Sequence, residues 1–153
     1  MFVYTAKLSR KKLLAVLLAV AAVAALILFF ALRGGGKRSA PAVRTNEDRV
    51  AYLEALGWEV EDTPLETQEV IIPETFEGVY EDYAKLQADQ GFDLAKYAGM
   101  EATRYTYVVE NYPDAQGQVV ADLLICRNRV VAGDVQSVAL DGFMQGLAFP
   151  GGS

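Results

Sequence analysis

The sequence predicts an α+β protein in which an N-terminal transmembrane helix precedes a small antiparallel-sheet domain with helices on one face. Three observations lead to this prediction. Residues 13–32 contain no polar side chain, and a helix of that length spans about 30 Å, the thickness of bilayer hydrocarbon. Two later segments repeat apolar residues at helical spacing. The remaining segments alternate or are continuously apolar, as strands are, which gives the order α-β-β-α-β-β-β.

Charge divides the chain into two unlike parts. Residues 1–43 hold seven basic side chains and no acidic one, whereas residues 44–153 hold seven basic and all 20 acidic ones, a balance of −13. This acidic balance excludes nucleic acid as an expected partner, because phosphate repels it. The chain is therefore divided into a basic cytoplasmic start at 1–12, a transmembrane helix at 13–32, a flexible Gly-rich tether at 33–44 and an acidic soluble α+β domain at 45–149.

The apolar run is interpreted as an uncleaved signal-anchor. Cleaved signal peptides have apolar cores of about 7–15 residues, and the nearest small-residue site, at 40–42, is separated from the run by three basic residues. Four basic residues precede the run, so the positive-inside rule places the start in the cytoplasm. We expect a single-pass cell-membrane protein that contacts the lipid bilayer through residues 13–32. Its soluble domain is expected to be extracytoplasmic; the same domain anchored on the cytoplasmic side is the alternative.

The first helix of the soluble part is expected at residues 46–56. Thr45 is placed to cap its N-terminus, and Asp48 completes a weak capping box; Asn46 is the alternative N-cap. Gly57 supplies the left-handed residue that ends the helix, and Trp58 is expected to fold back over it in a Schellman arrangement.

The second helix is expected at residues 75–90. Gly91 ends it, Phe92 is expected to fold back on it, and a short turn follows at 94–98. Its apolar stripe has a 3.6-residue spacing and consists of Phe76, Val79, Tyr80, Tyr83 and Leu86.

Strands account for the rest of the domain. A hairpin is predicted because residues 58–61 and 68–72 flank the turn-forming residues 62–64. Asn128 is expected to make a second turn. Residues 119–126, which are apolar on both faces apart from Asp122, are expected to form the central strand. Further strands are expected at 104–110 and 130–135, continuing over 136–140.

Few side chains suit catalysis. The chain has no His and one Cys, Cys126, which excludes Ser-His-Asp triads, Cys-His pairs and His-ligated zinc. Cys126 is interpreted as a small buried hydrophobe. Asp134 follows Gly133 within a strand, where we expect a β-bulge, and Asp141 ends the next segment. We expect a non-enzymatic binding or regulatory module for an unknown envelope protein or cell-wall partner. The alternative is a carboxylate-based envelope hydrolase using Asp134 and Asp141.

Two other groups of side chains are candidates for a functional role. Glu77 and Glu81 lie on the polar side of the second expected helix and are interpreted as a solvated acidic face. Tyr112, in the turn Asn-Tyr-Pro-Asp, either packs the turn or binds a sugar or peptide as an exposed aromatic. The sequence lacks the D-x-D-x-D-G calcium-loop pattern. Neither a metal nor a cofactor is therefore expected.

Six short motifs follow one another along the soluble part. They are Gly57-Trp58-Glu59-Val60, Ile72-Pro73, Gln90-Gly91-Phe92-Asp93-Leu94, Asn111-Tyr112-Pro113, Gly133-Asp134-Val135 and Leu140-Asp141-Gly142. In this order they resemble an uncharacterised domain-of-unknown-function family of small membrane-anchored proteins from clostridia and related Firmicutes. The resemblance covers residues 46–147 and implies a Gram-positive envelope location. It implies no catalytic or binding residue.

Protease added to intact spheroplasts is expected to remove the soluble domain and leave a small membrane-protected fragment containing residues 1–32. The reason is the greater basic charge before the apolar run, which holds the start in the cytoplasm. Immunoblotting of the membrane fraction with an N-terminal tag measures this. Digestion only after lysis would place the domain in the cytoplasm, and a mature N-terminus at Val43 would show that the anchor is cleaved.

Overall fold

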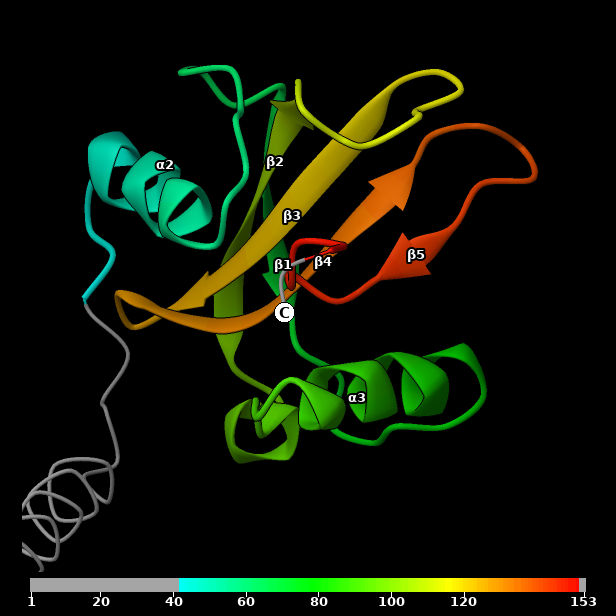
Figure 1. Cartoon of the computed structure of the whole chain (residues 1–153). Helices are drawn as coiled ribbons and strands as arrows, with labels where there is room; N and C mark the ends of the chain where they lie inside the picture. Colours follow the sequence, from blue (N-terminus) through cyan, green and yellow to red (C-terminus); the bar gives the residue numbers. More distant parts are fainter. Residues whose placement is uncertain (1–41, 152–153) are drawn as a thin grey trace, which may run out of the picture. The chain divides into compact units, whose positions relative to one another are not determined.

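A computed structural model describes residues 42–151 of the chain (Figure 1). The predicted start and transmembrane helix lie outside these residues, as does most of the predicted tether. No helix within residues 42–151 is long and apolar enough to cross a membrane. Val43, which the sequence analysis assigned to the tether, is 2% exposed, and its N–H donates to the Asn128 carbonyl at 2.8 Å. The folded domain therefore includes residues that precede the first helix.

The domain is built on a five-stranded antiparallel sheet in the order β1-β2-β3-β4-β5. The strands are β1 (Glu66–Ile71), β2 (Glu101–Val109), β3 (Val119–Cys126), β4 (Arg129–Ser137) and β5 (Met144–Gln145). Helix α2 (Asn46–Ala55) precedes β1, whereas helix α3 (Val79–Asp89) and the 3-10 helix η1 (Leu94–Tyr97) connect β1 to β2. The α+β class and the antiparallel sheet are confirmed.

The two helices pack on opposite faces of the sheet, so the prediction that both cover one face is wrong. Ala121 and Leu123 of β3 belong to the same core cluster as Leu53 of α2. Leu124 and Cys126 belong to a second cluster, which includes side chains of α3 and η1. Because successive side chains of a strand point to opposite faces, β3 is buried on both. Its central position is therefore confirmed, and the sheet is the middle layer of three.

The N-cap and the glycine ending of α2 form as predicted. The Asp48 N–H donates to the Thr45 hydroxyl at 3.2 Å, and the Thr45 N–H donates back to the Asp48 carboxylate at 3.0 Å. Gly57 has φ of 98°, and the Trp58 N–H donates to the Leu53 carbonyl at 3.1 Å. This is the Schellman pattern, and it places the indole in the core with 1% exposure.

Helix α3 differs from its prediction at its start and in its buried face. It begins at Val79 after Gly78, four residues later than expected. Val79 and Tyr80 of the predicted stripe are 78% and 54% exposed, whereas Gln87 is fully buried. The predicted stripe is therefore confirmed at Phe76 and Tyr83, which pack against the second core cluster, and wrong at Val79 and Tyr80. The ending is confirmed, since the Phe92 N–H donates to the Gln87 carbonyl at 3.0 Å.

The predicted hairpin between residues 58–61 and 68–72 does not form. Both segments pair instead with the same edge of β2. The Glu61 N–H donates to the Val108 carbonyl at 3.0 Å, and residues 68–71 pair with residues 104–101 of β2. The long strand β2 thus offers hydrogen-bond partners to both segments, one after the other.

A β-bulge occurs in the hairpin of β3 and β4, but not at the predicted place. The register shifts between Leu124 and Ile125, whereas Gly133 and Asp134 pair with β3 in regular register. Gly133 is required for another reason. A Cβ at this position would lie 2.5 Å from the Leu147 side chain, which is too close for two carbon atoms.

Replacing Trp58 with Ala is expected to lower the free energy of unfolding by about 3–5 kcal/mol, because it leaves a large cavity. It also removes the indole N–H that donates to the Leu147 carbonyl at 2.7 Å. Urea denaturation measures the change, and Tyr80→Ala, at a 54% exposed position, is the control with an expected change within about 0.5 kcal/mol. Equal stability of the two variants would contradict the role given to Trp58.

Candidate functional site

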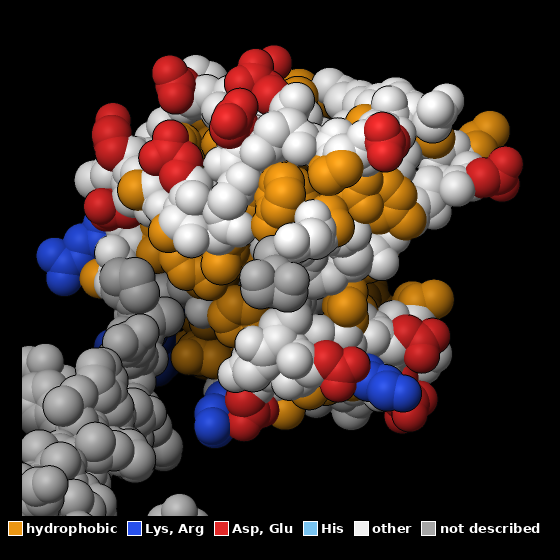
Figure 2. Space-filling model, viewed as in Figure 1, with side chains coloured by type: hydrophobic (Ala, Val, Ile, Leu, Met, Phe, Trp, Pro, Cys, Tyr) orange, Lys and Arg blue, Asp and Glu red, His pale blue; other side chains and the backbone are white. Residues whose placement is uncertain are grey.

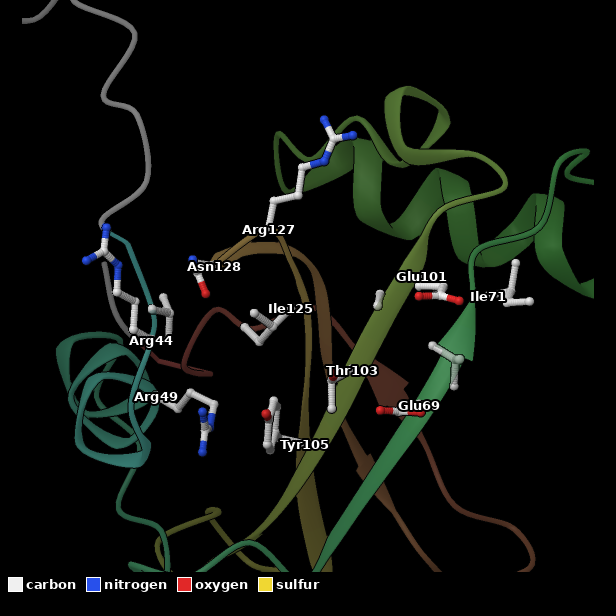
Figure 3. Close-up of a pocket in the computed structure, with 13 residues that line it drawn as sticks. Arg44, Arg49, Glu69, Ile71, Glu101, Thr103, Tyr105, Ile125, Arg127 and Asn128 are labelled. Carbon is white, nitrogen blue, oxygen red and sulfur yellow. The ribbon is translucent and has the colours of Figure 1, made fainter.

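An open groove of about 510 Å³ lies on the α2 face of the sheet, between α2 and β1 (Figure 3). Thr103 and Tyr105 of β2 and Ile125 of β3 lie along its floor. Arg44 and Arg49 stand on the α2 side, and β1 forms the opposite side. The groove exists because α2 is short and leaves this end of the sheet face uncovered.

Arg49 is the most constrained charged side chain of the groove. It is 8% exposed, its Nε–H donates to the Tyr107 hydroxyl at 2.8 Å, and its Cζ lies 3.7 Å from the centre of the Tyr105 ring. The Tyr107 hydroxyl in turn donates to the Asn46 Oδ1 at 2.8 Å. No carboxylate within residues 42–151 forms a salt bridge with Arg49. A buried charge without a counter-ion is unfavourable, so this guanidinium is suited to receive an anion.

Basic side chains concentrate at this groove within an acidic domain. Three of the seven Lys and Arg of residues 42–151 line it, namely Arg44, Arg49 and Arg127. Acidic side chains gather elsewhere, over α2 and the loop that follows it and again along α3 (Figure 2). Two acidic residues, Glu69 and Glu101, also line the groove, on the side away from Arg49. The groove is thus positive on one side and negative on the other.

A second polar cluster lies within the sheet, on the α3 face. Asp122 and Asp134 pair directly across β3 and β4 and are 5% and 2% exposed. Asp122 accepts hydrogen bonds from the Thr106 hydroxyl and, at 3.0 Å, from Gln136 Nε2. The Tyr83 hydroxyl of α3 donates to Asp134 Oδ1 at 3.1 Å, whereas the buried Asp134 Oδ2 has no partner within the described residues.

Burial makes Asp134 a proton-binding group. Burial, and secondarily the negative charge of Asp122, raises the pKa of Asp134 to about 7. Burial also raises the pKa of Tyr83 well above its usual value near 10, so the phenol stays neutral. Neither carboxylate lines the arginine groove. The cluster therefore ties α3 to the sheet rather than facing a ligand.

The structure does not bring Asp134 and Asp141 into one site. Asp141 is exposed in the loop between β4 and β5, where it lines a second groove of about 460 Å³ with Tyr112 and Phe143. The carboxylate opposite Asp134 is Asp122, which the sequence analysis noted only as a polar residue in an apolar strand. A two-residue turn would pair Asp122 with residue 133, and the bulge in β4 moves the register by one residue.

The other candidate side chains occupy structural positions. The Tyr112 ring stacks on Trp58 at 5.9 Å and on Phe143 at 4.7 Å, and its hydroxyl donates to Gln145 Oε1 at 3.0 Å. Tyr112 therefore packs its turn, which is one of its two expected roles. Cys126 is 2% exposed, as predicted. The acidic residues of α3 and its preceding loop are exposed, and these are Glu74, Glu77, Glu81 and Asp82.

The groove missed by the sequence analysis had one partial signal. Arg49 is the one basic residue of a helix whose other charged residues are acidic, and Tyr105 and Tyr107 alternate in a later strand. Nothing in the sequence placed this arginine against those tyrosines. Its charge alone predicted a solvent-exposed side chain.

These features define a small α+β domain in which a five-stranded sheet lies between two helices and one face carries an arginine-lined groove. The chain matches the family described as Domain of unknown function (DUF4830) over residues 52–135, more than half of its length, and belongs to that family. The expected membership of an uncharacterised domain family is thus confirmed. Comparisons with curated proteins and with solved structures gave no match.

The free energy of unfolding of the Asp134→Asn variant, measured relative to that of the wild type, is expected to be higher at pH 8 than at pH 5. Above pH 4 the unfolded chain releases the Asp134 proton while the folded state keeps it up to pH about 7. Stability is therefore lost as pH rises through this range, at up to about 1.4 kcal/mol per pH unit. Urea denaturation of both proteins at the two pH values measures this. Parallel pH dependence in both proteins would contradict it.

Proposed function

We propose that this chain is a single-pass, membrane-anchored binding module whose extracytoplasmic domain binds an anionic ligand in the groove beside Arg49. The observation that carries the proposal is a buried guanidinium without a carboxylate partner in the described residues, at the wall of an open groove. Tyr107 and the Tyr105 ring hold this guanidinium in place before any ligand arrives. Such preorganisation lowers the entropy cost of binding.

The membrane part of the proposal is supported by the sequence. Residues 13–32 are long and apolar enough to span a bilayer, and more basic residues precede them than follow closely. The resemblance to small membrane-anchored proteins of clostridia and related Firmicutes favours the same setting. On this basis the ligand belongs to an envelope protein or a cell-wall component, and the tether gives the domain room to reach it.

Two observations favour binding over carboxylate-based hydrolysis. A general acid needs a raised pKa and access to substrate. Within residues 42–151, the carboxyl group with a strongly raised pKa is Asp134, and it lines neither groove. The groove carboxylates Glu69 and Glu101 are instead exposed to water. They are thus placed to contact a ligand and are not desolvated as a general acid requires.

The probe that tests the anion site is N-acetyl-trialanine, which carries one carboxylate and no ammonium. Calorimetric titration into the purified full chain in detergent is expected to detect binding. Arg49→Gln is expected to weaken it by roughly 10–100-fold, because a hydrogen bond to a charged group contributes about 1.5–3 kcal/mol.

Arg127→Gln and Lys85→Gln complete this experiment. Both side chains are exposed, so neither substitution disturbs the core, but only Arg127 lines the groove. Arg127→Gln is expected to weaken binding and Lys85→Gln to leave it unchanged. Equal weakening by both would show non-specific attraction, and absence of binding to the wild-type chain would overturn the proposed anion site.

A further inference from the structure

The two sides of the groove carry charges of opposite sign. Arg44 and Arg49 lie on the α2 side and Arg127 at the turn after β3, whereas Glu69 lies on β1 and Glu101 at the start of β2 (Figure 3). A ligand with negative charge alone would meet attraction on one side and repulsion on the other. A ligand that carries both charges matches both sides.

The register of β1 and β2 sets the separation of these charges. The Arg49 guanidinium stacks on Tyr105, and Glu69 pairs with Thr103, two residues earlier on β2. Two residues along a strand and one strand spacing across the sheet place the Glu69 Cα about 8 Å from the Tyr105 Cα. The ends of a peptide of two or three residues are about 7–10 Å apart. A short peptide can therefore reach both charges at once.

The floor and volume of the groove fit the same class of ligand. Thr103 and Ile125 lie between the charged sides and offer a hydroxyl and an apolar contact to a peptide backbone and side chain. The cavity volume of about 510 Å³ is within the range of small-ligand sites, about 300–1,000 Å³. An anionic lipid surface fits less well, because Glu69 and Glu101 would face its phosphates.

We infer that the groove binds a short zwitterionic peptide, whose C-terminal carboxylate contacts Arg49 and whose ammonium group lies between Glu69 and Glu101. This inference rests on the proposed function and names the ligand class of that same site. Arg44 adds positive charge on the α2 side, near the carboxylate, and Arg127 adds positive charge at the turn after β3.

Three tripeptide probes with the same side chains test this inference on the full chain in detergent: trialanine, N-acetyl-trialanine and trialanine amide. Trialanine is expected to bind at least about tenfold more tightly than either blocked peptide, because each blocked peptide lacks one charge–charge contact. The double variant Glu69→Gln/Glu101→Gln is expected to bind trialanine and N-acetyl-trialanine equally. Glu77→Gln, which removes an exposed carboxylate outside the groove, is expected to keep the difference.

The outcomes separate this inference from the proposed function. Equal affinity of the wild-type chain for trialanine and N-acetyl-trialanine, with the binding of both weakened by Arg127→Gln, would contradict the inference of a zwitterionic ligand. That result would still agree with the proposed anion site. Absence of binding for all three peptides would overturn both. Binding of phosphatidylglycerol vesicles through the soluble domain, lost in Arg127→Gln while the peptides do not bind, would assign the arginines to a lipid surface and overturn the peptide ligand.

Discussion

The burial of strand β3 on both faces is the constraint on which the rest of the domain depends. Its odd-numbered side chains pack beneath α2, and its even-numbered ones face α3 and η1. Each helix therefore needs its own face, and the chain reaches the second one through the connection from β1 to β2. Because α2 has only 10 residues, it leaves part of its face open. The arginine groove occupies this uncovered part, so the candidate site lies where the sheet face has no helix packed on it.

Helix α3 buries polar side chains because it lies beside an edge of the sheet whose backbone groups lack a strand partner. The β5 strand has two residues and leaves part of the β4 edge without a strand partner. Gln87 Oε1 accepts the Gly133 N–H at 2.9 Å, and Gln90 Nε2 donates to the Gly133 carbonyl at 3.0 Å. Gln90 Oε1 also accepts the Leu147 N–H at 2.6 Å. Two glutamines thus replace a neighbouring strand, because buried backbone groups require partners.

The bulge in β4 has an electrostatic consequence. Without it, Asp122 and Asp134 would project from opposite faces of the sheet, because a shift of one residue reverses every side chain. With it, the two carboxylates share one buried site together with Tyr83 and Thr106. The shared site keeps a proton on Asp134 up to pH about 7 and gives α3 a polar attachment to the sheet. This attachment lies on the face opposite the groove, so the stability of one face and binding on the other rest on separate side chains.

Local signals determined what the sequence could show by itself. The capping box at Thr45, the glycine endings of both helices and the continuous apolar run of β3 each depend on neighbours within a few residues, and all three form. The face that each helix covers, the pairing of Asp122 with Asp134 and the burial of Arg49 were decided by tertiary structure alone. Arg49 and its partner Tyr107 are 58 residues apart, and the sheet register brings them together. Periodicity describes one element at a time, whereas a site of this kind arises where an arginine of one layer meets tyrosines of another.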